Sequence, residues 1–342
     1  MELNWIAPDH WKCIETIDAH TAGEPLRIFT KGLPEIKGST VLERRRYFRE
    51  NYDHLRTSTM FEPRGHADMY GAILIPPNTP DADFGVFFIH NEGYSTMCGH
   101  AIIALSKILP EIGLVEKNGD EFELKIDAPA GRIHSKVKRF NGKFDSVSFR
   151  NVPSFVLMKD QEIKVEGIGI VNFDIAYGGA FYAFVDADKI GLGLQVTDYN
   201  QIIDWGKRIK NAVMQNFEIK HPFEEDLSFL YGTIFTGKAN DSKNHSRNVC
   251  VFAEGEVDRS PTGTGVSARA AIHYFRKEIG IGESIRIESI LDTCFEVKVV
   301  EEVGFGGHHA VIPEVIGNAY ITGQHKFYFD PEDPLVKGFI FR

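Results

Sequence analysis

One short segment limits how this chain can fold. Residues 101–109 read Ala-Ile-Ile-Ala-Leu-Ser-Lys-Ile-Leu, a stretch that is apolar on nearly every face of a helix. A helix of that kind has to be enclosed by protein. Around it lie many runs rich in Val, Phe and Ile that are bounded by turn residues, such as 85–90 and 248–252, and few convincing helices. The sequence therefore predicts a helix over 99–109 wrapped by a curved, mostly antiparallel sheet.

The same order of elements occurs twice along the chain. In the first half, a strand is followed by Glu92-Gly93, by Met97-Cys98-Gly99 and by the apolar helix. In the second half, a strand is followed by Glu254-Gly255, by Pro261-Thr262-Gly263 and by a helix predicted over 265–278. This repeat predicts two similar α+β units whose helix starts face one cleft, where free N–H groups attract anions.

The length of the chain agrees with two units. With 342 residues, it has room for two domains of about 150 residues each. We predict an α+β fold of two pseudo-symmetric domains with the active site in the cleft between them. The N-terminal domain covers residues 1–165 and is joined by the tail 326–342, and the C-terminal domain covers 166–325. The junction is expected in a loop region around 155–170.

Composition excludes several classes of function. The net charge is −10 and no basic stripe stands out, which argues against nucleic acid as a partner. The run Arg44-Arg45-Arg46 is interpreted as a solvated helix face. No apolar window approaches a membrane span, and residues 1–5 do not resemble a signal peptide. The four cysteines are widely scattered, which fits a reducing compartment, so we expect a cytoplasmic protein.

Cys98 is the first candidate for chemistry. It stands at the start of the apolar helix, where the partial positive charge of the helix N-terminus is expected to lower the thiol pKa. Gly99 leaves the backbone open to a ligand, and His100 adds a polar group on the first turn. A Cys98–His100 dyad is not expected, because residues this close in sequence do not face each other on a helix. The alternative is that Cys98 is a buried small hydrophobic residue.

The second helix start offers a complementary set of groups. Gly263 allows a tight turn, Thr264 is expected to cap the helix, and the backbone N–H groups there can hold a carboxylate. Asp258 can hold a protonated amine, or it can merely cap a turn. An anion site, an acid and a reactive thiol together suggest a zwitterionic amino acid as substrate. His308 and His309 are adjacent in a strand and point to opposite faces, so no metal site is predicted.

Several stretches together resemble the proline racemase family over about residues 15–340. They are Ile17–Pro25, Pro63–Gly71, Met97–His100, Asp258–Pro261, Gly263–Gly265 and Gly317–Gly323. The resemblance implies two domains, each a sheet around a central helix, and a site without metal or cofactor. Family racemases carry a cysteine at both helix starts. The first maps to Cys98, whereas Thr262 occupies the second position. The positions that match substrate-holding residues of the family are Gly99, His100, Asp258, Gly263 and Thr264.

Thr262 changes the reaction that we expect. A threonine hydroxyl does not titrate in the range of a thiol, so it cannot serve as the second base. The branch of the family with threonine here resembles enzymes that dehydrate trans-3-hydroxy-L-proline to 1-pyrroline-2-carboxylate. In that small imino acid the 3-hydroxyl and the α-hydrogen lie on one face of the ring, so Cys98 alone suffices for a syn elimination and Thr262 has a positional role.

Two other functions stay open at this point. One is a hydroxyproline 2-epimerase or proline racemase, against which Thr262 argues. The other is a catalytically inactive amino-acid-binding protein, against which the complete set of Cys98, Asp258 and Gly263-Thr264 argues. The sequence also leaves the oligomeric state open, with a homodimer as one option, and it does not say which group protonates the leaving hydroxyl.

Overall fold

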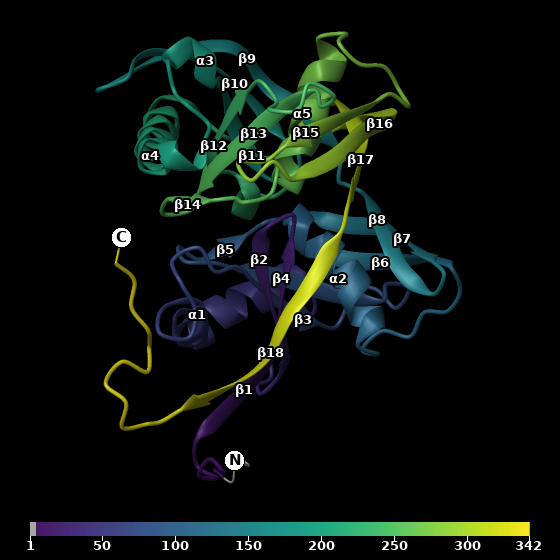
Figure 1. Cartoon of the computed structure of the whole chain (residues 1–342), viewed down its shortest axis with the longest axis vertical. Helices are drawn as coiled ribbons and strands as arrows, with labels where there is room; N and C mark the ends of the chain where they lie inside the picture. The colour runs from purple at the N-terminus through teal and green to yellow at the C-terminus, as the bar shows by residue number, and fades with distance from the viewer. Residues whose placement is uncertain (1–4, 342) are drawn as a thin grey trace.

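The computed structural model describes residues 5–341, which form two halves stacked along the long axis of the molecule (Figure 1). The N-terminal half contains helices α1 (Val41–Met60) and α2 (Gly99–Glu111). Its strands are β1 (Lys12–Thr21), β2 (Glu24–Lys31), β3 (Gly71–Ile75), β4 (Phe84–Ile89), β5 (Tyr94–Ser95), β6 (Glu121–Ala128), β7 (Gly131–Phe140), β8 (Lys143–Arg150) and, from the far end of the chain, β18 (Ala319–Phe329).

The C-terminal half contains helices α3 (Ala187–Ile190), α4 (Tyr199–Asn216) and α5 (Gly263–Phe275), with short 3₁₀ turns η1 (Val196–Asp198) and η2 (Glu225–Leu227). Its strands are β9 (Ser154–Val165), β10 (Gly169–Tyr177), β11 (Phe181–Asp186), β12 (Leu230–Gly237), β13 (Ser246–Phe252), β14 (Glu256–Val257), β15 (Ser284–Glu288), β16 (Cys294–Phe305) and β17 (His308–Gly317).

The two halves repeat one pattern of strand pairing. In the N-terminal half the order is β18-β1-β2-β3-β4-β6-β7-β8, with β5 paired to β4. In the C-terminal half it is β9-β10-β11-β12-β13-β15-β16-β17, with β14 paired to β13. The parallel pairs occupy equivalent positions in the two halves: β2–β3 corresponds to β11–β12, and β4–β6 corresponds to β13–β15. The predicted α+β fold of two pseudo-symmetric, mostly antiparallel units is confirmed.

Each half encloses one helix. Every residue of α2 from Gly99 to Leu109 is buried, as the apolar segment predicts, and α2 packs against β1, β2, β7, β8 and β18. Helix α5 is buried from Gly263 to Ile272 and packs against β9, β10, β16 and β17. Because α5 begins at Gly263 rather than at 265, its N-cap residue is Thr262. The expectation that Thr264 caps this helix is therefore wrong.

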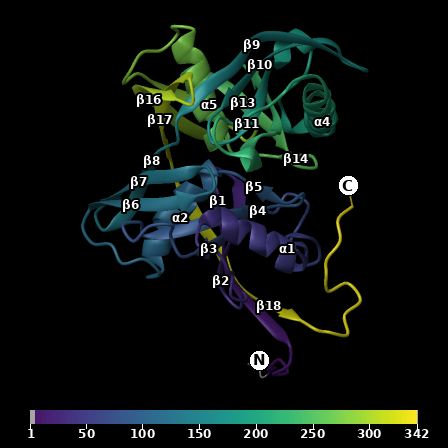
Figure 2. The same cartoon turned by 180° about the vertical axis from the view of Figure 1, so that it is seen from behind.

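The chain passes between the halves at two places. The region around 155–170 is not a loop as expected, because β9 occupies most of it and pairs with β10 and β17. At the far end, the chain leaves β17 at Gly317 and enters β18 at Ala319. β18, drawn in yellow, runs down into the N-terminal half (Figures 1 and 2). We propose that the domain junction lies between β8 and β9, and that the return to the N-terminal domain begins at β18.

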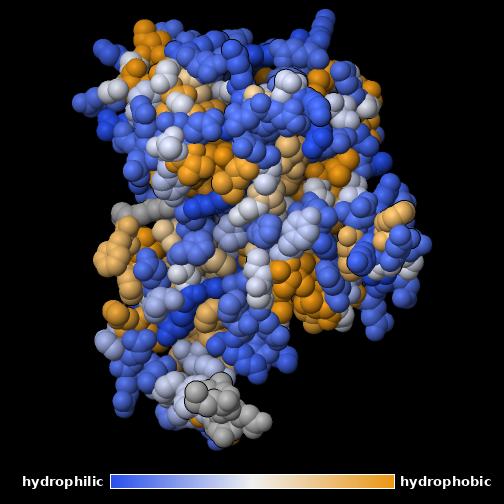
Figure 3. Space-filling view, in the orientation of Figure 1, coloured by the Kyte–Doolittle hydropathy of each residue, from blue (hydrophilic) through white to orange (hydrophobic). Residues whose placement is uncertain are grey.

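The surface corrects one further expectation. Arg45 does not lie on a solvated helix face: it is buried in α1, donates to the Ser95 carbonyl at 3.3 Å and pairs with Asp226 at 3.5 Å. Otherwise the face seen in Figure 3 is mostly hydrophilic, with apolar side chains in small groups. Across residues 5–341, none of the helices combines the length and the apolar character that crossing a lipid bilayer requires.

Candidate active site

The two buried helices meet at their N-termini. A Cβ added to Gly99 would lie 2.5 Å from the Cα of Gly263, and a Cβ added to Gly263 would lie 2.6 Å from the Cα of Gly99. Only glycine leaves room for this approach of two backbones. The structure therefore brings together all seven residues predicted for the site, which are Cys98, Gly99, His100, Asp258, Thr262, Gly263 and Thr264, and all of them are buried.

Cys98 and His100 face each other, contrary to expectation. Cys98 is the N-cap of α2 and has extended backbone angles, so its side chain folds back over the first turn. Its Sγ atom accepts the Ala101 N–H at 3.3 Å and lies 3.1 Å from Nδ1 of His100. The expectation rested on spacing within a helix, and it fails because Cys98 lies just outside the helix. The thiol and the imidazole thus form a pair.

Burial governs the protonation of both members of this pair. It raises the pKa of the Cys98 thiol well above its ordinary value, although the Ala101 N–H at the helix start acts in the opposite direction. The expected lowering of the thiol pKa is therefore wrong. Burial also lowers the pKa of His100 to about 3. The His100 ring hydrogen-bonds the backbone of Pro25, which has no N–H, so the ring is the donor there and its second nitrogen can accept a proton.

Thr262 stands at the opposite helix start. As the N-cap of α5 it has a φ of +67°, in the region that favours glycine, and such strain is found mostly at functional sites. The Thr262 side chain is buried, and its hydroxyl interacts with the side chains of Asp258 and Cys250. Its neighbour Thr264 is the second residue of the helix, and the Thr264 hydroxyl bonds the Tyr182 hydroxyl at 2.7 Å.

Two buried carboxyl groups adjoin the helix starts. Asp258 accepts the Ser260 N–H at 2.7 Å, and burial raises its pKa. Glu24, which the sequence argument missed, is fully buried at the start of β2 and accepts the Arg259 N–H at 2.6 Å. Burial and the neighbouring Asp258 raise the pKa of Glu24 well above its ordinary value. Its place in the stretch Ile17–Pro25 was the available signal.

Aromatic rings pack beside the thiol–imidazole pair. The Tyr70 ring lies edge-on to His100 at 4.9 Å and stacks on His90 at 5.7 Å, and its hydroxyl bonds the Ser95 hydroxyl. Tyr231 and Phe252 stack at 5.3 Å against the same group. Tyr70 lies within the stretch Pro63–Gly71, but nothing in its spacing connects it to Cys98. These rings make one side of the site apolar.

Polar contacts join the two halves around the site. The Arg259 guanidinium pairs with Asp68, which also accepts the Tyr199 hydroxyl at 3.0 Å. On the other side of the helix starts, the Asn91 N–H donates to Glu256 at 2.8 Å. Each contact links a residue of the N-terminal half to one of the C-terminal half, so the two helix starts are held together.

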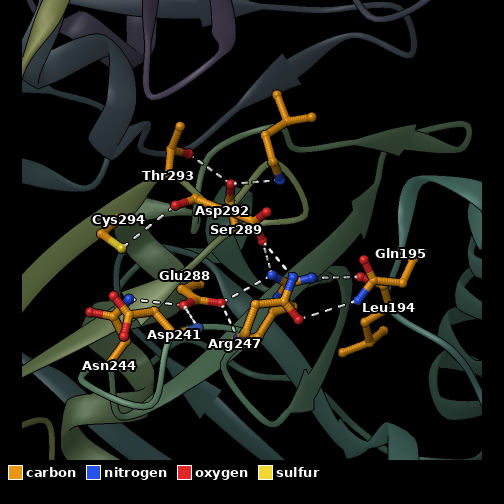
Figure 4. Close-up of polar contacts among 12 residues, drawn as sticks. Leu194, Gln195, Asp241, Asn244, Arg247, Glu288, Ser289, Asp292, Thr293 and Cys294 are labelled. Atoms are coloured by element: carbon orange, nitrogen blue, oxygen red, sulfur yellow. Dashed lines mark hydrogen bonds and ion pairs between the residues drawn. The ribbon is translucent and has the colours of Figure 1, made fainter.

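A second network supports one wall of this junction (Figure 4). The buried Arg247 pairs with Glu288 at 3.0 Å and with Asp292, and Glu288 also accepts the Asn244 side-chain amide at 2.8 Å. This network fixes the loop before β16. From that loop, the Thr293 hydroxyl donates to the Ala22 carbonyl at 2.7 Å, in the β1–β2 turn that precedes Glu24.

The histidines considered for metal binding have other neighbours. The His308 ring stacks on Phe155 at 4.4 Å, and His309 faces Glu302 at 3.3 Å. Another histidine of the C-terminal half, His245, bonds the Ser246 hydroxyl at 2.8 Å. In the described part of the chain, no group of three or more His, Cys, Asp or Glu side chains is arranged to hold a metal ion.

Comparison with known proteins places the chain among well-defined relatives. The model of the family described as proline racemase matches residues 16–340. A trans-3-hydroxy-L-proline dehydratase from Colwellia psychrerythraea is 50% identical over 337 residues, which cover 98% of this chain and 95% of the relative. The human protein of the same name is 45% identical over 335 residues, 96% of this chain and 95% of the relative. A solved hydroxyproline epimerase from Agrobacterium vitis, with trans-4-hydroxy-L-proline bound, has a TM-score of 0.92 at 29% identity and covers 98% of this chain and 96% of its own.

Proposed function

The chain belongs to the proline racemase family, and from that premise we propose that it is a trans-3-hydroxy-L-proline dehydratase. The observation that carries the proposal is that Cys98 stands at one helix start and Thr262 stands at the other. Inversion at the α-carbon needs a titrating group on each face of the ring, and a threonine hydroxyl does not ionise near neutral pH. Dehydration of this substrate needs chemistry on one face only.

The buried groups match the charges of the substrate. Backbone N–H groups at the starts of α2 and α5, around Gly99 and Gly263, would bind the carboxylate. Asp258 would bind the ring ammonium. Together they would hold the imino acid between the helix starts with its α-hydrogen toward Cys98. The same N–H groups would stabilise the negative charge that spreads into the carboxylate as the α-proton leaves.

The Cys98–His100 pair would supply both proton transfers. The thiol proton passes first to the free nitrogen of the neutral His100 ring. The Cys98 thiolate then takes the α-proton, and the His100 imidazolium returns its proton to the 3-hydroxyl as the C–O bond breaks. Water and an enamine are released, and Cys98 and His100 return to the neutral thiol and the neutral imidazole. The enamine tautomerises to 1-pyrroline-2-carboxylate. Burial favours the neutral thiol and the neutral ring, which are the protonation states in which Cys98 and His100 begin and end the reaction.

We also propose an environment and a partner for the protein. All four cysteines are free, which supports a reducing compartment such as the cytoplasm. The acidic net charge of −10 argues against nucleic acid as a partner. A homodimer stays an open proposal, and a small imino acid is the partner that the site supports.

The proposal is tested with three substrates and two variants. Purified protein is incubated with trans-3-hydroxy-L-proline, trans-4-hydroxy-L-proline and L-proline, and the imine product is trapped by reduction. We expect the imine from the first substrate only. Cys98→Ser should lower the rate by about 1,000-fold or more and stop loss of an α-deuterium label, because the base is gone. Cys13→Ser, a half-buried thiol in β1, is the control and should behave as wild type.

Two results would contradict the proposal. Dehydration that persists in Cys98→Ser would remove Cys98 as the base. Inversion of trans-4-hydroxy-L-proline or L-proline by the wild-type protein, without release of water from the 3-hydroxy substrate, would make it an epimerase or racemase instead.

A further inference from the structure

The β1–β2 turn reaches the junction of the two helix starts. Its Thr21 hydroxyl donates to the His100 carbonyl at 2.8 Å, and its Pro25 backbone bonds the His100 ring. A Cβ added to Gly23 would lie 3.3 Å from the Cβ of Arg259 in the opposite half. Glu24 is therefore placed by its own turn between the His100 side of the site and the Asp258 side.

The two carboxyl oxygens of Glu24 have different surroundings. Oε2 accepts the backbone N–H of Arg259 at 2.6 Å, whereas Oε1 is buried without a hydrogen-bond partner among residues 5–341. Arg259 directly follows Asp258. The bond thus reaches from the N-terminal half to the peptide unit that carries Asp258, and it adds to the restraint that the Ser260 N–H places on the Asp258 carboxylate.

The titratable and charged groups near Glu24 come from four places in the fold. Asp258 and Arg259 lie just after β14, Glu256 lies in β14, the Cys98 thiol lies at the start of α2, and the Cys250 thiol lies in β13. The Arg259 guanidinium is engaged by Asp68 and by the Val257 carbonyl, so the described contact between Arg259 and the Glu24 carboxyl is the backbone one. Burial and Asp258 favour a protonated Glu24. A protonated carboxyl group still has a carbonyl oxygen, which can accept the hydrogen bond from an N–H at the same position.

We propose that Glu24 is a positioning residue for the amine end of the substrate, holding Asp258 in place through its hydrogen bond to the Arg259 N–H. The inference rests on the proposed function, because it takes the ligand to be an imino acid whose ammonium group binds to Asp258. Glu24 acts across the junction of the halves, so the correct placement of Asp258 depends on their being closed together. Its hydrogen bond, rather than its charge, does the positioning.

The test compares two variants with one control. Glu24→Gln keeps an acceptor for the Arg259 N–H without a titrating group, and Glu24→Ala removes the acceptor. Asp226→Asn is the control, because it weakens contacts of Arg45 and Arg46 across the same junction away from the helix starts. Calorimetry measures the affinity for L-proline, which carries the ammonium, and for tetrahydrofuran-2-carboxylate, which lacks it.

We expect Glu24→Ala to weaken L-proline binding about 10-fold relative to tetrahydrofuran-2-carboxylate, as loss of one positioned polar contact does. Glu24→Gln and Asp226→Asn should stay within about 3-fold of wild type for both ligands. With trans-3-hydroxy-L-proline, Glu24→Ala should raise KM more than it lowers kcat, because the loss lies in binding the ammonium.

Three results would overturn the inference. They are wild-type binding of L-proline by Glu24→Ala, equal weakening of both ligands, and a Glu24→Gln variant as impaired as Glu24→Ala. The last would mean that the charge, not the hydrogen bond, is needed. Binding of L-proline does not require turnover, so failure of the dehydratase proposal would appear separately, as a wild-type protein that binds the imino acid and releases no water.

Discussion

Gly99 and Gly263 touch backbone to backbone, one at each helix start, and neither position has room for a Cβ atom. We predict that Gly99→Ala lowers kcat/KM about 100-fold or more, because the added methyl pushes the two helix starts apart and misplaces the groups that hold the substrate. Steady-state kinetics on trans-3-hydroxy-L-proline measure the effect. Gly304→Ala is the control, since a Cβ there meets open space, and it should change kcat/KM by less than about 2-fold. Equal effects at both glycines would contradict the prediction.

Thr262→Cys should add α-proton exchange on the opposite face. The new thiol would stand at the start of α5, facing the substrate from the side away from Cys98, and a thiol can exchange a proton where a hydroxyl cannot. We expect slow conversion of L-proline to D-proline in the variant and none in wild type. Chiral chromatography, which separates D-proline from L-proline, measures the conversion. Thr262→Ser is the matched control, and D-proline formed by that variant would show that the thiol is not the cause.

Acidification should destabilise the protein through its buried histidines. Burial lowers the pKa of His90 to about 3 from its ordinary value of 6.5, so between these values the unfolded chain binds a proton that the folded protein does not. Folding is then weakened as the pH falls below about 6.5, by up to about 2 kcal/mol for this group at about pH 5. The raised pKa values of Glu24 and Asp258 act in the opposite direction, because the folded protein keeps those protons longer.

A variant isolates the contribution of the histidine. Thermal melting of His90→Gln between about pH 7.5 and 5 should show a smaller loss of stability than wild type, because the carboxyl groups are common to both. His309→Gln is the control, since its side chain is 85% exposed, and it should follow wild type. A pH dependence unchanged in His90→Gln would contradict the assignment.

The Arg247 network should carry much of the stability of the C-terminal half. Arg247 and Glu288 are both 1% exposed, so Arg247→Met leaves a buried carboxylate without its cation. We expect a loss of about 3–5 kcal/mol in the free energy of unfolding, measured by denaturant titration. Arg208→Met removes the half-exposed pair with Asp204 and should cost about 1 kcal/mol or less. Similar losses in the two variants would be inconsistent with this account.

Local pattern was enough to predict the fold and the two buried helix starts. The apolar segment 101–109 determined one enclosed helix, and the repeated turn motifs before Gly99 and Gly263 predicted the second. A helix with so strong a pattern has few alternatives, which is why both helices form close to the expected residues, although α5 runs from Gly263 to Phe275 instead of over 265–278. The repeat then predicted that their starts would meet.

What escaped the sequence depends on neighbours far along the chain. The helix start alone predicts a lowered pKa for the Cys98 thiol, but burial raises that pKa by more than the Ala101 N–H lowers it. Arg45 was interpreted as solvated because it lies in a run of charged residues. Its side chain instead hydrogen-bonds Asp226 and the Ser95 carbonyl, which lie far from it along the chain. Glu24 gains its role only because Arg259 folds against it. In each case the deciding partner lies tens or hundreds of residues away, where periodicity and spacing carry no information.

The pairing of β1 with β18 has a consequence for biosynthesis. The register runs from Lys12 opposite Phe329 to Thr21 opposite Ala319, so the first strand of the described chain pairs with the last one. All the strands of the C-terminal half are consecutive in the chain and emerge from the ribosome before β18 does. Because domains fold as their segments become available, the later-made half can complete its sheet first. The half that carries Cys98 is begun first and finished last, so a chain cut short before residue 319 would lack the strand that closes it.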